Sequence, residues 1–151
     1  MFVKDYENGF QCYVPDEFSE IKKENYESWN VAESTLHYFV ELDEDGEVWK
    51  AVSINLLDDA ESEEEFAEVV DKNVKDIESL DFEIVEVEDF KLPNDRVVKR
   101  VLSKDKDDEN LFVTYFMNIS KHVICSTIMI AEEYDEEETI VATIYSSMKE
   151  I

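Results

Sequence analysis

Apolar and polar residues alternate through the first third of the chain, which is the pattern of β-strands with one buried face. A short strand is predicted over residues 10–14, because the turn signal Asn8-Gly9 precedes it and Pro15 ends it. Apolar residues at every second position predict a β-hairpin over residues 36–56, with its turn at residues 43–46.

The spacing of apolar residues changes to a helical period in two places. Ser62 and Glu65 form a capping box, and residues 66–80 carry apolar side chains three and four positions apart, which predicts a helix. Asp135 and Glu138 have the spacing of a second helix start. We expect this last helix to bury one apolar stripe in the core, formed by Ile140, Ile144, Met148 and Ile151.

Four strands are predicted between the two helices. The first two cover residues 82–87 and 97–102, and the other two cover residues 111–119 and 123–131. The last pair is apolar on both faces, which is typical of strands in the middle of a sheet that is covered on two sides. The expected fold is α+β: a single domain over residues 1–151, with a mainly antiparallel sheet of about six to seven strands and helices on both faces, an α-β-α sandwich.

The strong negative charge of the chain argues against some classes of binding partner. The 151 residues include 40 Asp and Glu against 14 Lys and Arg, which gives a formal net charge of -26. Such a surface repels nucleic-acid phosphates and anionic lipid head groups, so we expect neither of these partners. The acidity fits either simple solubility or recognition of a basic protein, and a DNA mimic is a special case of the second.

The sequence also bears on the compartment. The N-terminal residues 1–6 lack the apolar core of a signal peptide, and no stretch approaches the roughly 18 apolar residues of a membrane span. A cytoplasmic protein is therefore expected.

Three short motifs, one near each end and one in the middle, occur together in this chain. They are Tyr6-x-x-Gly9-Phe10-x-x-Tyr13-x-Pro15, Ser62-Glu63-Glu64-Glu65-Phe66 and Ile144-Tyr145-Ser146-Ser147-Met148. In this combination the chain resembles the PsbP-like family, which includes the photosystem II extrinsic subunit P, a Ran-binding nuclear import factor and many prokaryotic proteins. The resemblance implies an α-β-α sandwich that acts as a binding or assembly module without a catalytic set.

The chain departs from that family in two respects. A transit peptide is not expected from its N-terminal residues, and Asp16-Glu17-Phe18 follows Pro15 where relatives often have a Trp. A photosynthetic role is therefore not expected, and no functional residue is carried over from the family.

Two acidic runs resemble calcium-binding loops in composition. They lie at residues 43–46 and 105–109. Neither fits an EF-hand, because the twelfth position, where a bidentate Glu is needed, falls on Ile54 in the first and on Phe116 in the second. We interpret both runs as turns.

No catalytic, cofactor-binding or metal-binding residue is assigned from the sequence, and no cofactor is expected. Cys12, Cys125, His37 and His122 are the only cysteines and histidines, and only His122 and Cys125 are close in sequence, so a zinc site or a Cys-His nucleophile is not indicated. Cys125 lies in an apolar strand, where a thiol should remain protonated. The many carboxylates supply pairs everywhere and therefore indicate no acid-base site.

The two tryptophans are candidates for an interface or for the core. Trp29 lies in the irregular segment, and Trp49 lies on the strand face opposite Val48 and Val52. Because both faces of the sheet are expected to be covered, Trp49 is expected beneath a helix, with an interface position as the alternative.

Three functions are compatible with these features. The leading hypothesis is a non-enzymatic binding or assembly module that engages a protein partner, preferably a basic one, through its acidic surface. The first alternative is a small enzyme or ligand carrier with a cleft beside the sheet. The second is an immunity or inhibitor protein against a basic toxin or nuclease, where negative charge would speed association.

Overall fold

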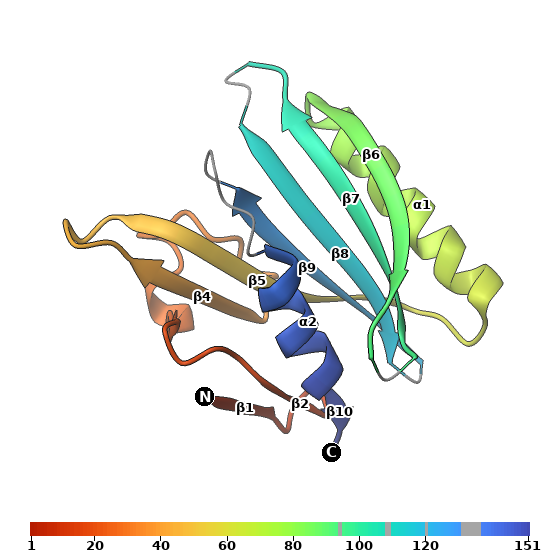
Figure 1. The fold of residues 1–151 in the computed structure, drawn as a ribbon, viewed down its shortest axis with the longest axis horizontal. Coiled ribbons are helices and arrows are strands. Elements are labelled where there is room, and N and C mark those ends of the chain that lie inside the picture. The colour runs from red at the N-terminus through yellow and green to blue at the C-terminus, as the bar shows by residue number, and fades with distance from the viewer. Residues whose placement is uncertain (94, 108–109, 120, 131–136) are drawn as a thin grey trace.

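The computed structural model describes residues 1–93, 95–107, 110–119, 121–130 and 137–151 (Figure 1). Its larger sheet is antiparallel throughout and has seven strands. In spatial order they are β3 (Ser19–Glu20), β4 (His37–Leu42), β5 (Val48–Asp59), β9 (His122–Ile130), β8 (Leu111–Ile119), β7 (Val97–Asp105) and β6 (Phe82–Lys91).

A smaller sheet brings the two ends of the chain together. It consists of β1 (Phe2–Asp5), β2 (Phe10–Tyr13) and β10 (Lys149–Glu150), with β2 in the middle. Gly9, before β2, has a φ of +77°, a left-handed conformation that glycine adopts without steric cost. A 3-10 turn, η1 (Lys23–Asn25), interrupts the long connection that precedes β4.

The described part of the chain contains two α-helices beside the sheets. α1 (Glu63–Ser79) begins as its capping box predicts, since the Ser62 hydroxyl accepts a hydrogen bond of 3.1 Å from the Glu65 backbone amide. α2 (Glu137–Ser147) is the predicted last helix, and the expected helix start at Asp135 lies outside the described residues. No helix in the described part of the chain has the length and apolarity to cross a membrane.

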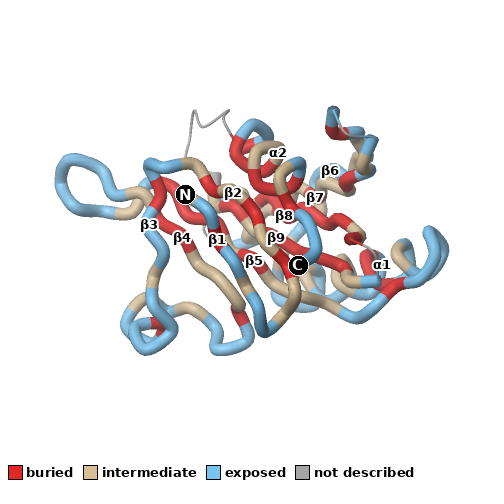
Figure 2. The backbone as a smooth tube through the Cα atoms, turned by 90° about the horizontal axis from the view of Figure 1, so that it is seen from below, coloured by how far each residue is buried: buried red, intermediate tan, exposed pale blue. Residues whose placement is uncertain are grey.

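The core is divided by the alternation of side chains along β8. Tyr115 and Met117 belong to the largest cluster of buried residues, together with Ile144 of α2. Phe116, which points the other way, lies in a smaller cluster with Val70 of α1. Figure 2 shows buried residues running along β8, β9 and α2. The structure thus confirms an α+β fold with a mainly antiparallel sheet of the predicted size.

Two expectations about burial are wrong. Ile151 is 55% exposed, because α2 ends at Ser147 and the chain continues as β10 rather than as helix. Trp49 is 41% exposed, and the Lys50 ammonium lies 4.2 Å from the centroid of its ring. Trp49 is therefore a surface residue with a cation-π contact rather than a core residue.

A buried ion pair fastens α2 to the sheet. The Arg100 guanidinium donates from Nη2 to Oε1 of Glu137 at 2.7 Å, and the Tyr115 hydroxyl donates to Oε2 of the same carboxylate at 2.6 Å. Burial and the Glu137 carboxylate both raise the pKa of Tyr115. Burial alone would lower the pKa of Arg100, but the hydrogen bond with Glu137 raises it overall. Both groups therefore keep their protons, and Glu137 accepts from both.

His37 on β4 links the two sheets through two carboxylates. Its Nδ1 lies 2.8 Å from Oε2 of Glu20 on β3, and its Nε2 lies 2.8 Å from Oδ2 of Asp5 on β1. Because ionised carboxylates only accept, this arrangement favours a ring that donates from both nitrogens, the protonated form. Burial alone would lower the pKa of His37, but Glu20 and Asp5 raise it overall. Burial would raise the pKa of Asp5, but hydrogen bonds from Asn8 and from His37 lower it overall.

Replacing His37 by Gln should therefore cost most stability in mildly acidic solution. The stabilisation from protonated His37 is fully present below the ordinary histidine pKa of 6.5 and is lost as pH rises through the higher pKa of the folded state. The stabilisation from Asp5 is present above its ordinary pKa of 3.8 and is lost as pH falls through the lower folded value. Urea unfolding at several pH values should show the largest difference from the parent protein between these two ordinary values.

The matched control is His122→Gln. The ring of His122 is more exposed and faces a single carboxylate, Asp59, at 3.0 Å. Its replacement should change stability little at any pH. A difference for His37→Gln that is constant across the whole range would contradict the double carboxylate contact.

Candidate binding pocket

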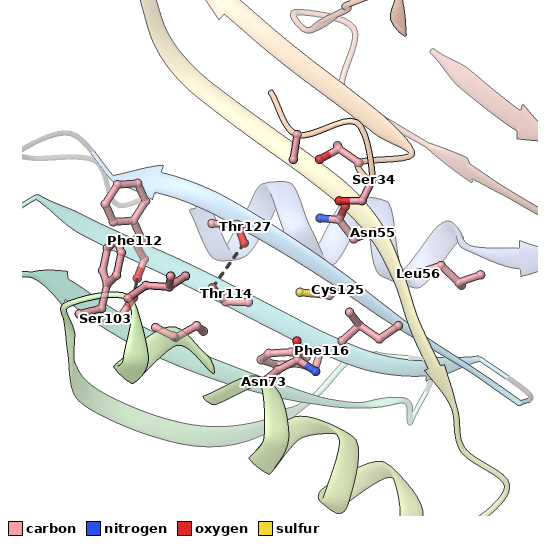
Figure 3. Close-up of a pocket in the computed structure, with 16 residues that line it drawn as sticks. Ser34, Asn55, Leu56, Asn73, Ser103, Phe112, Thr114, Phe116, Cys125 and Thr127 are labelled. Carbon is pink, nitrogen blue, oxygen red and sulfur yellow. Dashed lines mark hydrogen bonds between the residues drawn. The ribbon is translucent and has the colours of Figure 1, made fainter. Parts of the chain in front are cut away.

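A pocket of about 460 Å³ opens between α1 and the larger sheet (Figure 3). Residues of β5, β7, β8 and β9 form its floor, α1 forms one wall, and residues 32–35 contribute at the rim. Pockets for small molecules usually occupy about 300 to 1,000 Å³, so this one has the size of a ligand site.

The floor is built by side chains that share one face of three neighbouring strands. The antiparallel register places Thr114 on β8 opposite Thr127 on β9, and Phe116 opposite Cys125. Ser103 on β7 lines the same pocket. Residues two apart on a strand point to the same side, so these five side chains converge from segments that are distant in sequence.

The pocket exists because α1 covers only part of this face. Val70 of α1 belongs to the same buried cluster as Phe116. Beyond that cluster the floor carries the small side chains of Ser103, Thr114 and Thr127, which leave room that leucine or isoleucine would have filled.

The lining is uncharged, although the chain as a whole is not. Charged residues make up 36% of the sequence, yet none of the 16 residues that line the pocket carries a charge. The polar lining groups are hydroxyls and amides only. The remaining lining residues are apolar apart from one thiol, that of Cys125.

With the residues that the structure describes, the hydroxyls on the floor make only long hydrogen bonds. Oγ1 of Thr114 lies 3.4 Å from Oγ1 of Thr127, and the Ser103 hydroxyl donates to the carbonyl oxygen of Phe112 at 3.5 Å. Hydrogen bonds between oxygens are usually about 2.7 to 2.8 Å long, so these contacts are weak. The three hydroxyls therefore retain capacity to bind a ligand.

The Cys125 thiol in this pocket has a raised pKa. Its side chain is buried, and burial raises its pKa to about 12. The same holds for Cys12 on β2, whose pKa is raised to about 12 by burial and by the Glu20 charge. Both thiols are therefore protonated near neutral pH, as the sequence predicts for Cys125.

The other sequence candidates lie away from the pocket lining. His37 contacts two carboxylates and His122 contacts one, as described above. The acidic run at residues 43–46 forms the hairpin turn, in which Oδ1 of Asp43 accepts from the backbone amide of Glu47 at 2.9 Å. The second acidic run, at residues 105–109, includes two residues outside the described part. Within the described part, no group of three or more His, Cys, Asp or Glu side chains could hold a metal ion.

Comparison with protein-family models and with curated proteins gives no match. Comparison with solved structures gives matches. The solution structure of cyanobacterial PsbP (CyanoP) from Synechocystis sp. PCC 6803 superposes with a TM-score of 0.63 at 14% identity, over 100% of this chain and 92% of CyanoP. A crystal structure from Bacteroides thetaiotaomicron VPI-5482 gives a TM-score of 0.54 at 7% identity, over 94% of this chain but only 45% of that longer protein. The chain therefore has a PsbP-like fold, as the three sequence motifs imply.

Proposed function

We propose that this chain is a non-enzymatic binding module and that the pocket beside α1 holds a small, neutral, mostly apolar molecule. In this proposal the fold is an α-β-α sandwich whose face beneath α1 is incompletely filled. The separate clusters around Tyr115 with α2 and around Phe116 with α1 support it, as does Figure 1, where α2 lies in front of the sheet and α1 behind β6.

The uncharged lining is the observation that carries this proposal. An anion entering the pocket would lose hydration without meeting a cationic partner, in a protein whose net charge of -26 already repels it. A cation would be attracted to the protein but would find no carboxylate in the lining. A neutral molecule neither loses the hydration of a charge nor needs an oppositely charged partner in the lining.

The arrangement of hydroxyls suggests how such a molecule would be oriented. Ser103, Thr114 and Thr127 lie together on the floor, with Phe112 beside them and Phe116 further along (Figure 3). A carbonyl or hydroxyl group on the ligand would bind to the hydroxyls, while its apolar part would contact the aromatic rings.

Binding is favoured over catalysis by the state of the thiol among the described lining residues. Cys125 has a pKa of about 12 and is therefore a thiol rather than a thiolate at neutral pH. Among the enzyme and carrier alternatives, the uncharged lining supports the carrier.

The test uses the neutral fluorophore prodan, which combines a naphthalene ring with a ketone. Its emission should shift to shorter wavelength and saturate as protein is added. Decanamide should displace it at least about ten times better than decanoate, because only decanoate must bury a charge. Equal displacement by both, or the absence of saturable binding, would refute the proposal.

Matched variants separate the hydroxyls from the shape of the floor. Replacing Thr114 and Thr127 together by valine keeps their shape but removes both hydroxyls, and should weaken prodan binding about fivefold, the equivalent of one hydrogen bond. Replacing both by serine keeps the hydroxyls and should weaken binding less. Urea unfolding checks that all variants remain folded. If the valine variant bound as tightly as the parent, these hydroxyls would not contact the ligand.

A further inference from the structure

β6 is a long strand at one edge of the larger sheet. It runs for ten residues, pairs with β7 on one side and has no described strand on the other. Edge strands in soluble proteins are usually kept short or covered, because unpaired backbone groups can pair with another chain. At the opposite edge, β3 has only two residues. The length of β6 therefore calls for an explanation.

The exposed middle of β6 carries both apolar and acidic side chains, and its register with β7 shifts between Ile84 and Glu86, as at a β-bulge. Val85 is 52% exposed and Val87 is 49% exposed. Glu83 and Glu86 flank them and are also exposed. This edge combines a side without a described strand partner, exposed β-branched side chains and negative charge, which are the features that bind an added strand.

β7, the strand that already pairs with β6, shows which side chains pair with the acidic residues of β6. β7 combines valines with basic residues, and it carries three of the fourteen basic residues of the chain. The register places Lys99, Arg100 and Lys104 of β7 opposite Asp89, Glu88 and Glu83 of β6. Two of these pairs are ion pairs, with Nζ of Lys99 3.5 Å from Asp89 and Nη1 of Arg100 3.2 Å from Glu88. A second strand of the same composition would meet the same acidic strand from its free side.

A second copy of this chain is a poor occupant. Two β6 strands placed edge to edge would bring glutamates of both copies together, in molecules that each carry a net charge of -26. Like charges on adjacent strands are destabilising. The same acidic residues that prevent this self-association would attract a basic strand.

We propose that the free edge of β6 binds an extended segment of a partner protein that alternates lysine or arginine with β-branched residues, as an eighth strand of the larger sheet. This site is separate from the pocket and does not depend on a ligand there. In this proposal the acidic surface expected to bind a protein partner lies at β6, and the partner binds by adding a strand.

The experiment uses an acetylated, amidated peptide of four Lys-Val repeats with the full chain. In NMR titrations the peptide should shift the backbone amide signals of β6 more than those of β3 and β4. Two further peptides carry backbone N-methyl groups, one on the lysines and the other on the valines. An added strand uses only alternate amides, so one N-methylated peptide should bind at least about ten times more weakly while the other binds nearly as well as the parent peptide. Equal binding of both would indicate charge attraction alone and would overturn the proposal.

Charge variants locate the site. Glu83→Gln with Glu86→Gln should weaken peptide binding about fivefold, whereas Glu24→Gln with Glu27→Gln, on the segment near the opposite edge, removes the same charge and should weaken it less than about twofold. The same loss in both variants would refute an edge-strand site. Dimerisation of the parent protein through β6, seen by analytical ultracentrifugation and abolished by the peptide, would also refute it by assigning the edge to a second copy.

Discussion

Replacing Glu137 by alanine is expected to lower the free energy of unfolding by about 3 to 5 kcal/mol. Glu137 is the shared partner of Arg100 and Tyr115, and its side chain is only 8% exposed, as the Arg100 side chain is only 11% exposed. Without the carboxylate, a guanidinium and a phenol would remain buried beneath α2 without their main acceptor. Removing one member of a buried pair is costly because the other charge stays desolvated.

The neighbouring Glu138 provides the matched control. Its carboxylate lies 3.9 Å from Nε of Arg100, but its side chain is 61% exposed. Glu138→Ala should therefore cost less than about 1 kcal/mol, as exposed ion pairs do. Urea unfolding of both variants near neutral pH measures the two losses in the free energy of unfolding. Similar losses for the two substitutions would show that the buried geometry of Glu137 contributes nothing beyond general charge.

Features encoded by neighbouring residues could be predicted from the sequence. The N-cap predicted at Ser62 forms, because Ser62 and Glu65 lie in one helical turn, and the Glu65 carboxylate accepts from the backbone amide of Glu61, one residue before the N-cap. The hairpin of β4 and β5 also forms, with Gly46 in its turn at a φ of +81°. The apolar runs of β8 and β9 indicated central strands, and they are central.

Features that depend on distant segments could not be predicted. β1 and β10 are short, and each is defined by its pairing with β2 rather than by its own pattern. The helical spacing that placed Ile151 on the stripe of α2 continues past Ser147 in the sequence, but the chain leaves the helix there to pair with β2.

The pocket illustrates the same limit. Ser103, Thr114 and Thr127 are unremarkable in the sequence, because serine and threonine occur on many exposed strand positions. They become a site only through the register of three strands and the place where α1 stops covering them. The signal that could have found them is the presence of small polar residues on strands expected to be covered on both faces.

The two ends of the predicted stripe on the last helix should respond very differently to truncation to alanine. Ile144 is fully buried among the residues packed against α2, whereas Ile151 is 55% exposed. Ile144→Ala should cost about 2 to 5 kcal/mol, because it removes buried methyl groups and leaves a cavity. Ile151→Ala should change stability by less than about 0.5 kcal/mol, since it keeps the backbone amide that donates to the Gly9 carbonyl oxygen at 3.0 Å. Thermal or urea unfolding of the two variants measures both, and a comparable loss for Ile151→Ala would place that side chain in the core after all.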